Sequence, residues 1–365
     1  MRAVTMRDGH LDLKEVPDVD PNREQLLLEP IAAGVCGGDL NAMDHTEDFL
    51  HASRASGTPL FLFDPDRDLV FGHEFTARVV EVGADVDQFG VEYSPGDVLL
   101  VSPAVIDPEG VVHCVGYASD YPGALAERVV VAPFGHVKIP EGVSPYEAAA
   151  VDPLATGING VMRSKIEPPA GAIVTGCGPV GLGAVAELAA RGITPIVASE
   201  PSAERRRIAK AFGAHFAVDP AVDDPVAAWH DLAAPDQRLF VYEASGKPGV
   251  LDQLLYAAPQ FTRITVVGAC MVDDAIRPIV GIYKNITIEF CLGMGPDGAE
   301  YPFADTYQRM ADGRIDASQL VTGYASLVAV DDVFAHLRPG SYHDIEHMKI
   351  LIRHDLDGPG IHPPA

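Results

Sequence analysis

The pattern of apolar and polar positions divides the chain into two parts with different periodicities. In residues 1–150, short apolar runs alternate with Gly and Pro, as at 24–35, 75–86 and 95–103. Runs of this length between turn residues are typical of β-strands. We therefore predict a β-rich first part, built as a sandwich or barrel of short strands. Residues 41–69 break this pattern, and we interpret them as an irregular insertion.

From about residue 145 the pattern changes to segments that alternate between strand and helix periodicity. A helix is predicted over 144–164, broken or restarted at Pro153 because proline cannot donate a backbone hydrogen bond. Residues 171–214 follow as strand, glycine turn, helix, strand and helix. Consecutive βαβ units of this kind build a parallel sheet with right-handed crossovers. Further strands are predicted at 238–244, 263–269 and 286–292.

The length of the chain agrees with two domains, because 365 residues are more than twice the roughly 150 of an average domain. We predict an α/β protein. Its first domain spans 1–152 and is completed by about 295–365, which begins with a helix and ends in short strands. Its second domain spans 153–294.

Charge and composition exclude several classes of function. The chain has 26 Lys and Arg against 52 Asp and Glu, a net charge of −26, which repels nucleic acid and anionic membrane surfaces. The sequence shows neither an apolar run near the ~18 residues of a membrane span nor the pattern of a signal peptide. Five Cys, an odd number spread along the chain, favour a reducing compartment. We expect a cytoplasmic protein that binds neither nucleic acid nor membranes.

A glycine turn indicates a nucleotide site. The spacing GxGxxG is met by Gly176, Gly178 and Gly181, and the motif also contains Pro179 and Val180. It lies between a predicted strand and a predicted helix. In this context the first glycine allows a tight turn, the second admits a pyrophosphate, and the third allows close packing of helix and strand. The free N–H groups at the helix N-terminus then bind phosphate. A structural turn without a ligand is the alternative.

Glu200 follows this turn at about the 20-residue distance at which dinucleotide-binding folds place an acidic residue. Its carboxylate would accept hydrogen bonds from the adenosine ribose and repel a 2′-phosphate, which favours NAD over NADP. Arg205 lies close by and could offset that repulsion, so NADP is the less favoured alternative. We interpret Arg206 and Arg207 as part of a solvated helix face.

Three separate fragments carry side chains that bind metals, namely Cys36, His73 and Asp152. A thiolate, an imidazole and a carboxylate, with one position left for water, make a catalytic zinc site. Taken singly, such a Cys or His is more often a core residue. Their occurrence together with a dinucleotide motif favours the metal.

On these residues the sequence resembles the zinc-dependent medium-chain dehydrogenase/reductases, the family of alcohol, sorbitol and threonine dehydrogenases. The matching pieces span essentially the whole chain: GVCGGDL, GHEFTARVVEVG, PGDVL, GALAERVVV, AAAVDPLATG, GCGPVGL and ADGRI. The resemblance implies a GroES-like catalytic domain at 1–152 with 295–365, a Rossmann NAD-binding domain at 153–294, and an active site in the cleft between them.

The resemblance also implies roles for individual residues. Cys36 and His73 would ligate a catalytic zinc together with Asp152 or Glu74, because Glu74 is expected to bind the metal directly or to alternate with water. Asp39 would orient the zinc-bound imidazole and raise its basicity. The catalytic set implied by the resemblance is therefore Cys36, His73, Glu74 and Asp39.

Two departures from the family remove its usual proton relay. Gly38 stands where the family has Ser or Thr, and Asn41 where it often has His. A water held by Glu74, by Asp152 or by the cofactor ribose is one substitute. His45 is another, although a surface histidine is its simpler interpretation. Loss of general-base assistance typically lowers a rate by ~10²–10⁴-fold.

The remaining cysteines are interpreted as structural. The family's structural zinc needs four closely spaced Cys, and 102–122 contains only Cys114, so we predict one catalytic zinc and no structural zinc. Residues 113–123 could instead help to form the substrate pocket. Cys177, Cys270 and Cys291 are interpreted as small buried residues of the second domain.

These observations favour a zinc-dependent alcohol dehydrogenase that transfers a hydride between an alcohol or carbonyl substrate and NAD(H). Gly268, after a predicted strand, would present backbone groups to the cofactor carboxamide as in the family. The alternatives are a reductase of an activated C=C bond with the same fold, whose relatives lack the Cys and His, and a nucleotide-binding protein without catalysis. The resemblance implies a homodimer or homotetramer, with 286–290 as an edge where two copies could pair. The sequence does not specify the substrate.

Overall fold

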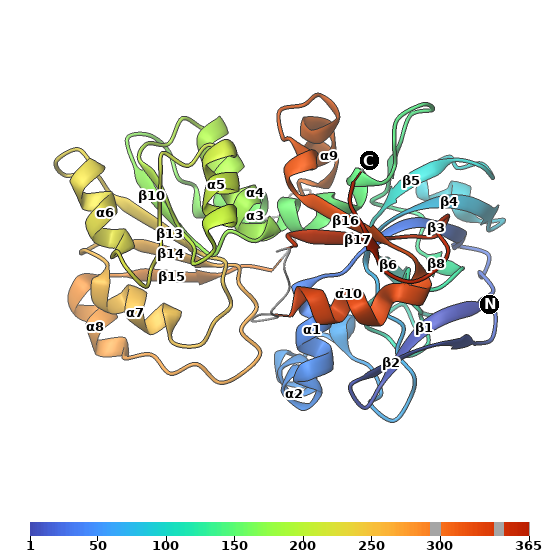
Figure 1. The fold of residues 1–365 in the computed structure, drawn as a ribbon. Helices are drawn as coiled ribbons and strands as arrows, with labels where there is room; N and C mark the ends of the chain where they lie inside the picture. Colours follow the sequence, from blue (N-terminus) through green and yellow to red (C-terminus); the bar gives the residue numbers. More distant parts are fainter. Residues whose placement is uncertain (293–300, 339–346, 365) are drawn as a thin grey trace. The chain divides into compact units, whose positions relative to one another are not determined.

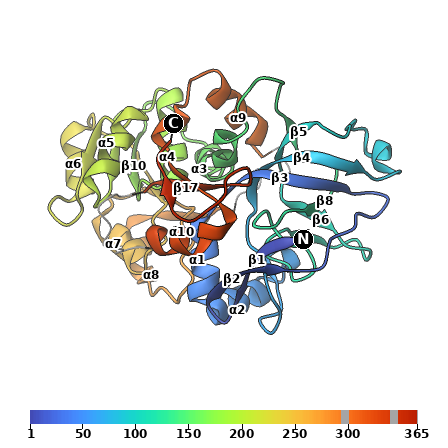
Figure 2. The ribbon, with the colours of Figure 1, turned by 45° about the vertical axis from the view of Figure 1, so that its right-hand side comes forward.

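A computed structural model describes residues 1–292, 301–338 and 347–364 of the chain (Figures 1 and 2). The chain forms two compact units, Met1–Ala150 with Leu320–Ala365, and Val151–Gln319. The first unit is thus assembled from both ends of the chain. The domain end expected at 294 lies outside the described residues. Helix α9 (Phe303–Ala311), which we expected to complete the first domain, belongs to the second unit.

The first unit is built on a mostly antiparallel sheet with the strand order β18-β16-β17-β3-β4-β5-β9, in which β8 also pairs with β3. Its strands are β3 (Leu26–Gly34), β4 (Glu74–Val82), β5 (Val98–Val101), β8 (Val129–Val131), β9 (Val137–Lys138), β16 (Val321–Ala325), β17 (Lys349–Arg353) and β18 (Ile361–His362). Fully buried apolar side chains such as Leu28, Phe75 and Leu100 form its core. The predicted β-rich first part is confirmed.

Two hairpins and a helix accompany this sheet. The hairpins are β1 (Arg2–Arg7) with β2 (His10–Glu15), and β6 (Ala104–Ile106) with β7 (Val112–Cys114). Helix α10 (Val330–Leu337) packs against both β2 and β17 (Figure 1).

Pairing along β3 brings together segments that are far apart in the sequence. At the end of β3, Gly34 lies opposite Glu74 of β4 on one side and Leu351 of β17 on the other. Cys36 follows shortly after Gly34, and Lys349 is the first residue of β17. Side chains on neighbouring strands lie within reach of one another. The register therefore gathers a thiol, a carboxylate and an ammonium at one end of the sheet.

The interpretation of 41–69 as an irregular insertion is wrong for much of its length. Helices α1 (Gly37–Asp44) and α2 (Thr46–Ser56) occupy it up to Gly57, whose φ of 71° ends α2 in the left-handed conformation. Acidic residues lie in the first turn of α2 and Arg54 in its last, which suits the helix dipole. The buried face of α2 consists of Phe49, Leu50 and Ser53, so its apolar periodicity is weak.

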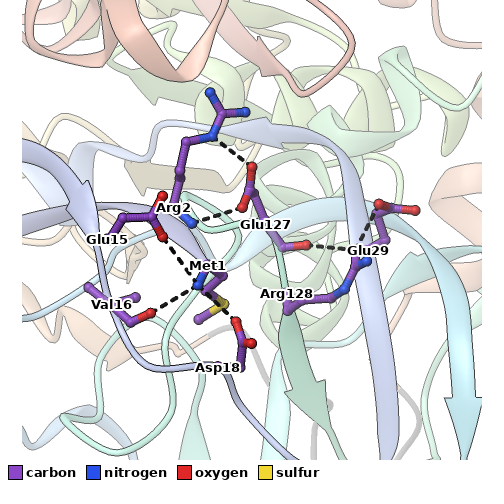
Figure 3. Close-up of polar contacts among 8 residues, drawn as sticks. All are labelled: Met1, Arg2, Glu15, Val16, Asp18, Glu29, Glu127 and Arg128. Atoms are coloured by element: carbon purple, nitrogen blue, oxygen red, sulfur yellow. Dashed lines mark hydrogen bonds and ion pairs between the residues drawn. The ribbon is translucent and has the colours of Figure 1, made fainter.

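Ion pairs join charged residues around the N-terminus of the first unit (Figure 3). The Met1 amine donates to the Asp18 carboxylate at 2.8 Å, Arg2 pairs with Glu127 at 2.7 Å, and Arg128 pairs with Glu29 at 2.7 Å. These residues line a surface cavity of about 740 Å³. Because their charges are already matched, we assign no ligand to this cavity.

The second unit is a parallel sheet with the strand order β12-β11-β10-β13-β14-β15. Its strands are β10 (Gly171–Thr175), β11 (Ile196–Ser199), β12 (Phe216–Val218), β13 (Leu239–Glu243), β14 (Arg263–Val266) and β15 (Thr287–Phe290). Its remaining helices are α3 (Val151–Ser164), α4 (Pro179–Ala190), α5 (Ala203–Ala211), α6 (Pro225–Leu232), α7 (Val250–Ala257) and α8 (Pro278–Lys284). The order reverses between β10 and β13, the point where such sheets bind ligands. The predicted α/β class with a Rossmann sheet is confirmed.

Helices cover both faces of this sheet. Trp229 of α6 and Leu254 of α7 pack on strand residues such as Val241, whereas α3, α4 and α5 group together in Figure 1. Pro153 lies in the first turn of α3, where a missing N–H breaks no helical hydrogen bond. The predicted helix over 144–164 is therefore interrupted before the proline: a short 3-10 turn at Glu147–Ala150 precedes α3, which begins at Val151. A Cβ on Gly183 would come within 2.9 Å of the Leu154 Cα, so α3 and α4 pack backbone to backbone.

Two surface features concern the second unit. Cys177 is buried as expected, but Cys270 and Cys291 are only half-buried, so their interpretation as buried residues is wrong. The edge strand β15 exposes Phe290 by 69%, and neighbouring α8 exposes Tyr283 by 73%.

In the part of the chain that the structure describes, none of the helices combines the length and apolar composition needed to cross a bilayer.

We expect the free energy of unfolding to decrease as the pH is lowered, because of His136. Its Nδ1 accepts from the Ser102 N–H at 3.1 Å and its Nε2 contacts the Ala132 carbonyl at 2.8 Å. Burial lowers the pKa of His136 to about 4, against about 6.5 in an unfolded chain. Between these values the unfolded state binds a proton that the folded state does not, so stability is lost as pH falls from 6.5 towards 4.

Denaturant unfolding at pH 7 and pH 5 measures this effect. The loss of stability between the two pH values should be smaller in His136→Gln than in the wild type. The exposed His10 provides the control, and His10→Gln should leave the loss unchanged. An equal loss in His136→Gln would contradict the assignment.

Candidate metal centre and nucleotide-binding turn

Three side chains of the ligand type meet in the first unit. Cys36, His73 and Glu74 each offer a ligand atom, and these atoms all lie within 4.8 Å of one another. Gly72, just before His73, has a φ of 107°, and a Cβ there would lie 2.8 Å from the backbone nitrogen of Ala124. Only glycine fits this close, left-handed turn, which places His73 beside the start of β4.

Cys36 is the N-cap residue of α1. Its Sγ accepts from the Gly38 N–H at 3.3 Å, and its own N–H donates to the Asp39 carboxylate at 2.9 Å, which closes a capping box. Burial and the nearby Glu74 carboxylate raise the pKa of the Cys36 thiol. A metal ion that binds such a thiol displaces its proton.

Asp39 lies between His73 and the backbone of Cys36, and it is 1% exposed. Its Oδ1 lies 3.3 Å from His73 Nδ1, an ion-pair contact that lacks the geometry of a hydrogen bond. Because Nδ1 faces Asp39, Nε2 is the nitrogen left to bind a metal. Burial disfavours the charged ring, but Asp39 and Cys36 together outweigh burial, and the pKa of His73 is raised well above its ordinary value.

Lys349 is a partner of Glu74 that the sequence did not indicate. Its ammonium pairs with Glu74 Oε2 and also donates to the Val35 carbonyl at 3.1 Å. The Lys349 side chain is 3% exposed and the Glu74 side chain 0%. Gly34 makes room for the pair, because a Cβ there would lie 2.8 Å from Lys349 Cε. Burial opposes the ammonium, yet Glu74 keeps the pKa of Lys349 raised.

The second carboxylate oxygen of Glu74 indicates that a cation fits this site. Glu74 Oε1 is buried and has no hydrogen-bond partner among the described residues. A buried polar atom without a partner costs about 1–3 kcal/mol, and more if it is charged. A metal ion held by Cys36, His73 and Glu74 would remove that cost. Sulfur, nitrogen and oxygen donors together are the set that zinc accepts.

Asp152, the further candidate ligand, lies in the first turn of α3 in the second unit and is half-buried. Its carbonyl accepts from the hydroxyls of Thr156 and Tyr301, at 3.2 and 3.1 Å. Its role in metal binding stays a prediction.

Tyr117 is a neighbour of the site that sequence reasoning missed. Its hydroxyl donates to Asp39 Oδ1 at 2.8 Å, and its ring lies 5.0 Å from the ring of His73. Burial and Asp39 raise the pKa of Tyr117 well above its ordinary value, so the hydroxyl stays protonated and donates. The only signal for Tyr117 in the sequence was an aromatic residue in the stretch 113–123. That signal did not distinguish a contact with Asp39 from a role in lining the substrate pocket.

Asn41, which replaces a histidine of the family's relay, and His45, the possible substitute, lie on or beside α1. Asn41 is half-buried within the helix. His45 is its exposed C-cap residue, which agrees with the interpretation of His45 as a surface histidine.

The glycine turn has the geometry that phosphate binding requires. Gly176 has a φ of 83°, Gly178 is the N-cap of α4, and the helix begins with Pro179 and Val180. A Cβ on Gly181 would lie 3.0 Å from the Gly176 carbonyl carbon, so helix and strand are in close contact. A Cβ on Gly178 would meet nothing within 4 Å, which leaves open space at the helix N-terminus.

Glu200 lies at the end of β11 and holds this turn. Its carboxylate accepts from the Cys177 N–H at 2.8 Å and from the Ser202 N–H at 3.0 Å, and the residue is 7% exposed. The expectation for Arg206 is wrong. Its guanidinium is partly buried and donates to the Glu200 carbonyl at 2.7 Å, because it closes the turn at the start of α5.

The other arginines of α5 differ in exposure. Arg205 is half-buried. Arg207 is exposed and pairs with Glu204 at 2.7 Å, in agreement with a solvated face.

Gly268 follows β14, and its N–H donates to the Glu243 carbonyl at 2.8 Å. Glu243 itself was not singled out from the sequence. It is 4% exposed, ends β13, and accepts from the N–H groups of Ser245 and Gly246 at 2.8 and 3.1 Å. A carboxylate at the end of the strand next to β10 is a signal that could have identified it.

Comparisons with known proteins agree with both units. Residues 22–141 match the family model of the alcohol dehydrogenase GroES-like domain, and residues 179–310 match the model described as zinc-binding dehydrogenase. The L-threonine 3-dehydrogenase of Pyrococcus abyssi is 30% identical over 267 residues, which are 70% of this chain and 72% of that protein.

A second relative matches nearly the whole chain. The (R,R)-butanediol dehydrogenase of Bacillus subtilis is 28% identical over 355 residues, 95% of this chain and 97% of that protein. A crystal structure of 2R,3R-butanediol dehydrogenase from the same species is similar with a TM-score of 0.75 and 26% identity, and covers 96% of this chain and 99% of its own.

Removal of the Lys349 ammonium should strongly destabilise the first unit. Lys349→Met leaves the Glu74 carboxylate buried without a cation, and breaking a buried pair in this way costs about 3–5 kcal/mol. Adding Glu74→Gln should restore part of the loss because the unmatched charge is gone. Urea unfolding of the metal-free protein measures each variant.

The pair of Lys138 and Asp97, at 2.8 Å, supplies the control because Lys138 is 52% exposed. Lys138→Met should cost at most about 1 kcal/mol. Equal losses of unfolding free energy in Lys349→Met and Lys138→Met would show that the buried pair contributes no more to stability than the exposed one.

Proposed function

The chain belongs to the zinc-dependent medium-chain dehydrogenase/reductase family, and we propose that it is a zinc-dependent alcohol dehydrogenase linked to NAD. It would oxidise an alcohol to the corresponding carbonyl compound, or reduce the carbonyl in the reverse direction. The names of its relatives favour secondary alcohols with a neighbouring polar group, such as vicinal diols, polyols and hydroxy amino acids.

The observation that carries this proposal is the cluster of Cys36, His73 and Glu74 with an unmatched, buried carboxylate oxygen on Glu74. A reductase of activated C=C bonds has no need of a thiol and an imidazole beside such a carboxylate. A protein that only senses a nucleotide has no need of them either. The cluster therefore favours metal-dependent chemistry over both alternatives.

When bound, zinc would act as a Lewis acid on the substrate oxygen, NAD⁺ would accept the hydride from the carbinol carbon, and the hydroxyl proton would be released to water. Cys36, His73 and Glu74 would hold the metal, and Asp152 is proposed as a further ligand. Asp39 would hold the His73 ring through Nδ1. Lys349 would hold Glu74 in place, so that the ligands are oriented before the metal binds.

The second unit would bind the cofactor at its glycine turn. The N–H groups at the start of α4 lie beside the open space at Gly178, where a pyrophosphate would be placed. Glu200 would face the adenosine ribose and disfavour a 2′-phosphate. Gly268 is proposed to lie near the carboxamide, and Arg205 near the adenosine.

We also propose one zinc per chain without a structural zinc, and a homodimer or homotetramer that forms through the exposed edge strand β15. The apolar side chain of Phe290 on that edge favours burial against a second copy. Sedimentation of the purified protein measures the assembly.

Zinc content and turnover test the proposed function together. The purified protein should hold about one zinc per chain and reduce NAD⁺ with a secondary alcohol or diol from a substrate panel. Cys36→Ser should lose most of the zinc and the turnover, because a hydroxyl replaces the thiolate ligand. Cys270→Ser, which changes a half-buried thiol of the second unit, should keep both.

Two results would count against the proposal. A wild-type protein with well under one zinc per chain and no turnover on the panel would overturn it. Turnover on an activated C=C bond that survives Cys36→Ser would favour the reductase instead.

Cofactor preference tests the role of Glu200. kcat/KM should be higher with NAD⁺ than with NADP⁺, because the carboxylate repels a 2′-phosphate. Glu200→Gln should narrow this ratio by removing the charge. Parallel steady-state assays measure both, and equal or better use of NADP⁺ by the wild type would refute the assignment.

A further inference from the structure

The hydroxyl of Tyr117 occupies the space beside Gly38. A Cβ on Gly38 would lie 2.9 Å from the Tyr117 hydroxyl oxygen, closer than real Cβ atoms approach another heavy atom, whereas Cys36 Sγ would be 3.6 Å away, an ordinary contact. A side chain at position 38 and the tyrosine hydroxyl therefore compete for one volume. Gly38 lies in the first turn of α1, where alanine would otherwise be favoured over glycine.

Packing holds the Tyr117 hydroxyl in that position. Tyr117 is 3% exposed, and its ring stacks on Phe49 with a centroid distance of 5.5 Å and an interplanar angle of 22°. Phe61 and Phe71 meet it edge-on, at centroid distances of 5.5 and 6.0 Å. Rotation of the ring would drive it into one of these neighbours, so the hydroxyl cannot simply move aside for a side chain at residue 38.

The same hydroxyl fixes a carboxylate that touches a candidate ligand. Tyr117 donates to Asp39 Oδ1 at 2.8 Å, and that oxygen lies 3.3 Å from His73 Nδ1. The other oxygen, Oδ2, accepts from the Cys36 N–H at 2.9 Å. Asp39 is therefore held at both oxygens by groups from separate segments, which sets the direction in which it faces His73.

We propose that Tyr117 is a positioning residue of the metal centre, which supplies from a distant loop a hydroxyl that residue 38 cannot carry. It acts through Asp39, whose orientation sets the ring of His73 for metal binding, and it needs glycine at position 38 to do so. This inference rests on the proposed metal-dependent function. It assigns a role to a residue that spacing and motif did not connect with the site.

Titration of the metal-free protein with Co²⁺ tests the positioning role. Tyr117→Phe removes one oxygen and keeps the ring packing, and groups that hold ligands in place typically change metal affinity by about 10–100-fold. We expect the Co²⁺ affinity of Tyr117→Phe to decrease by a factor in this range. We also expect the visible d–d bands to shift, because the His73 ring is less constrained. A merely structural role would not move the spectrum.

Tyr121→Phe is the matched control, because Tyr121 lies in the same loop and packs on His113 at a centroid distance of 5.6 Å. It should leave affinity and spectrum unchanged. Wild-type affinity and spectrum in Tyr117→Phe would overturn the positioning role.

A double-mutant cycle on the metal-free protein tests the shared space without metal or activity. Gly38→Ala should lower the thermal midpoint in the wild-type background, because its Cβ meets the Tyr117 hydroxyl. In the Tyr117→Phe background the same change should leave the midpoint unchanged or raise it, since Cys36 Sγ at 3.6 Å is then the nearest atom outside the ring. An equal decrease in both backgrounds would overturn the inference.

These experiments separate the inference from the function on which it rests. A wild type that binds zinc and oxidises alcohols, with Tyr117→Phe unchanged in Co²⁺ binding, refutes the role of Tyr117 and leaves the function standing. A wild type that binds neither zinc nor Co²⁺ refutes the function and the positioning role together.

Discussion

The ion pair between Glu74 and Lys349 is the interaction on which the first unit's site depends. Charges removed from water cost several kcal/mol each unless they are matched, so a buried carboxylate at the start of β4 requires a cation within reach. Lys349 meets that need only because β17 pairs with β3, and the pair fits only because Gly34 has no side chain. One Glu74 oxygen is thus neutralised. The other is buried without a hydrogen-bond partner among the described residues, on a carboxylate that lies beside Cys36 and His73. The ion pair, the sheet register and the metal cluster are parts of one arrangement.

Two buried carboxylates of the second unit are satisfied differently. Glu200 and Glu243 accept from backbone N–H groups of turns at the carboxyl ends of parallel strands. Because the donors belong to the turns, each carboxylate fixes the conformation of the loop around it. The acidic character of the chain, with a net charge of −26, therefore includes buried groups that shape the turn proposed to bind the cofactor, as well as exposed Asp and Glu.

Local patterns were enough to predict the parallel sheet, the glycine turn and the ligand-type residues, because each is encoded within a few neighbouring positions. The partners Lys349 and Tyr117 were not predicted. The contact of Lys349 with Glu74 depends on the register of β17, and the contact of Tyr117 with Asp39 depends on a loop that is distant from Asp39 in the sequence. The helices α1 and α2 were missed because their apolar faces are short, although Gly57 and Arg54 gave end signals. Arg206 was misread because its hydrogen bonds go to the backbone, which leaves no pattern in the side-chain sequence.

The assembly of the first unit from both ends of the chain determines the order in which the protein can be completed during synthesis. The second unit, Val151–Gln319, is synthesised before Lys349. Glu74 and Lys349 are separated by 275 positions, so the earlier carboxylate must wait for its cation while the nucleotide turn can already form. A nascent chain that stops before β17 would carry a finished Rossmann sheet and an unmatched acidic group at the proposed metal site. Early metal binding by Cys36 and His73 would have to proceed without a fixed Glu74.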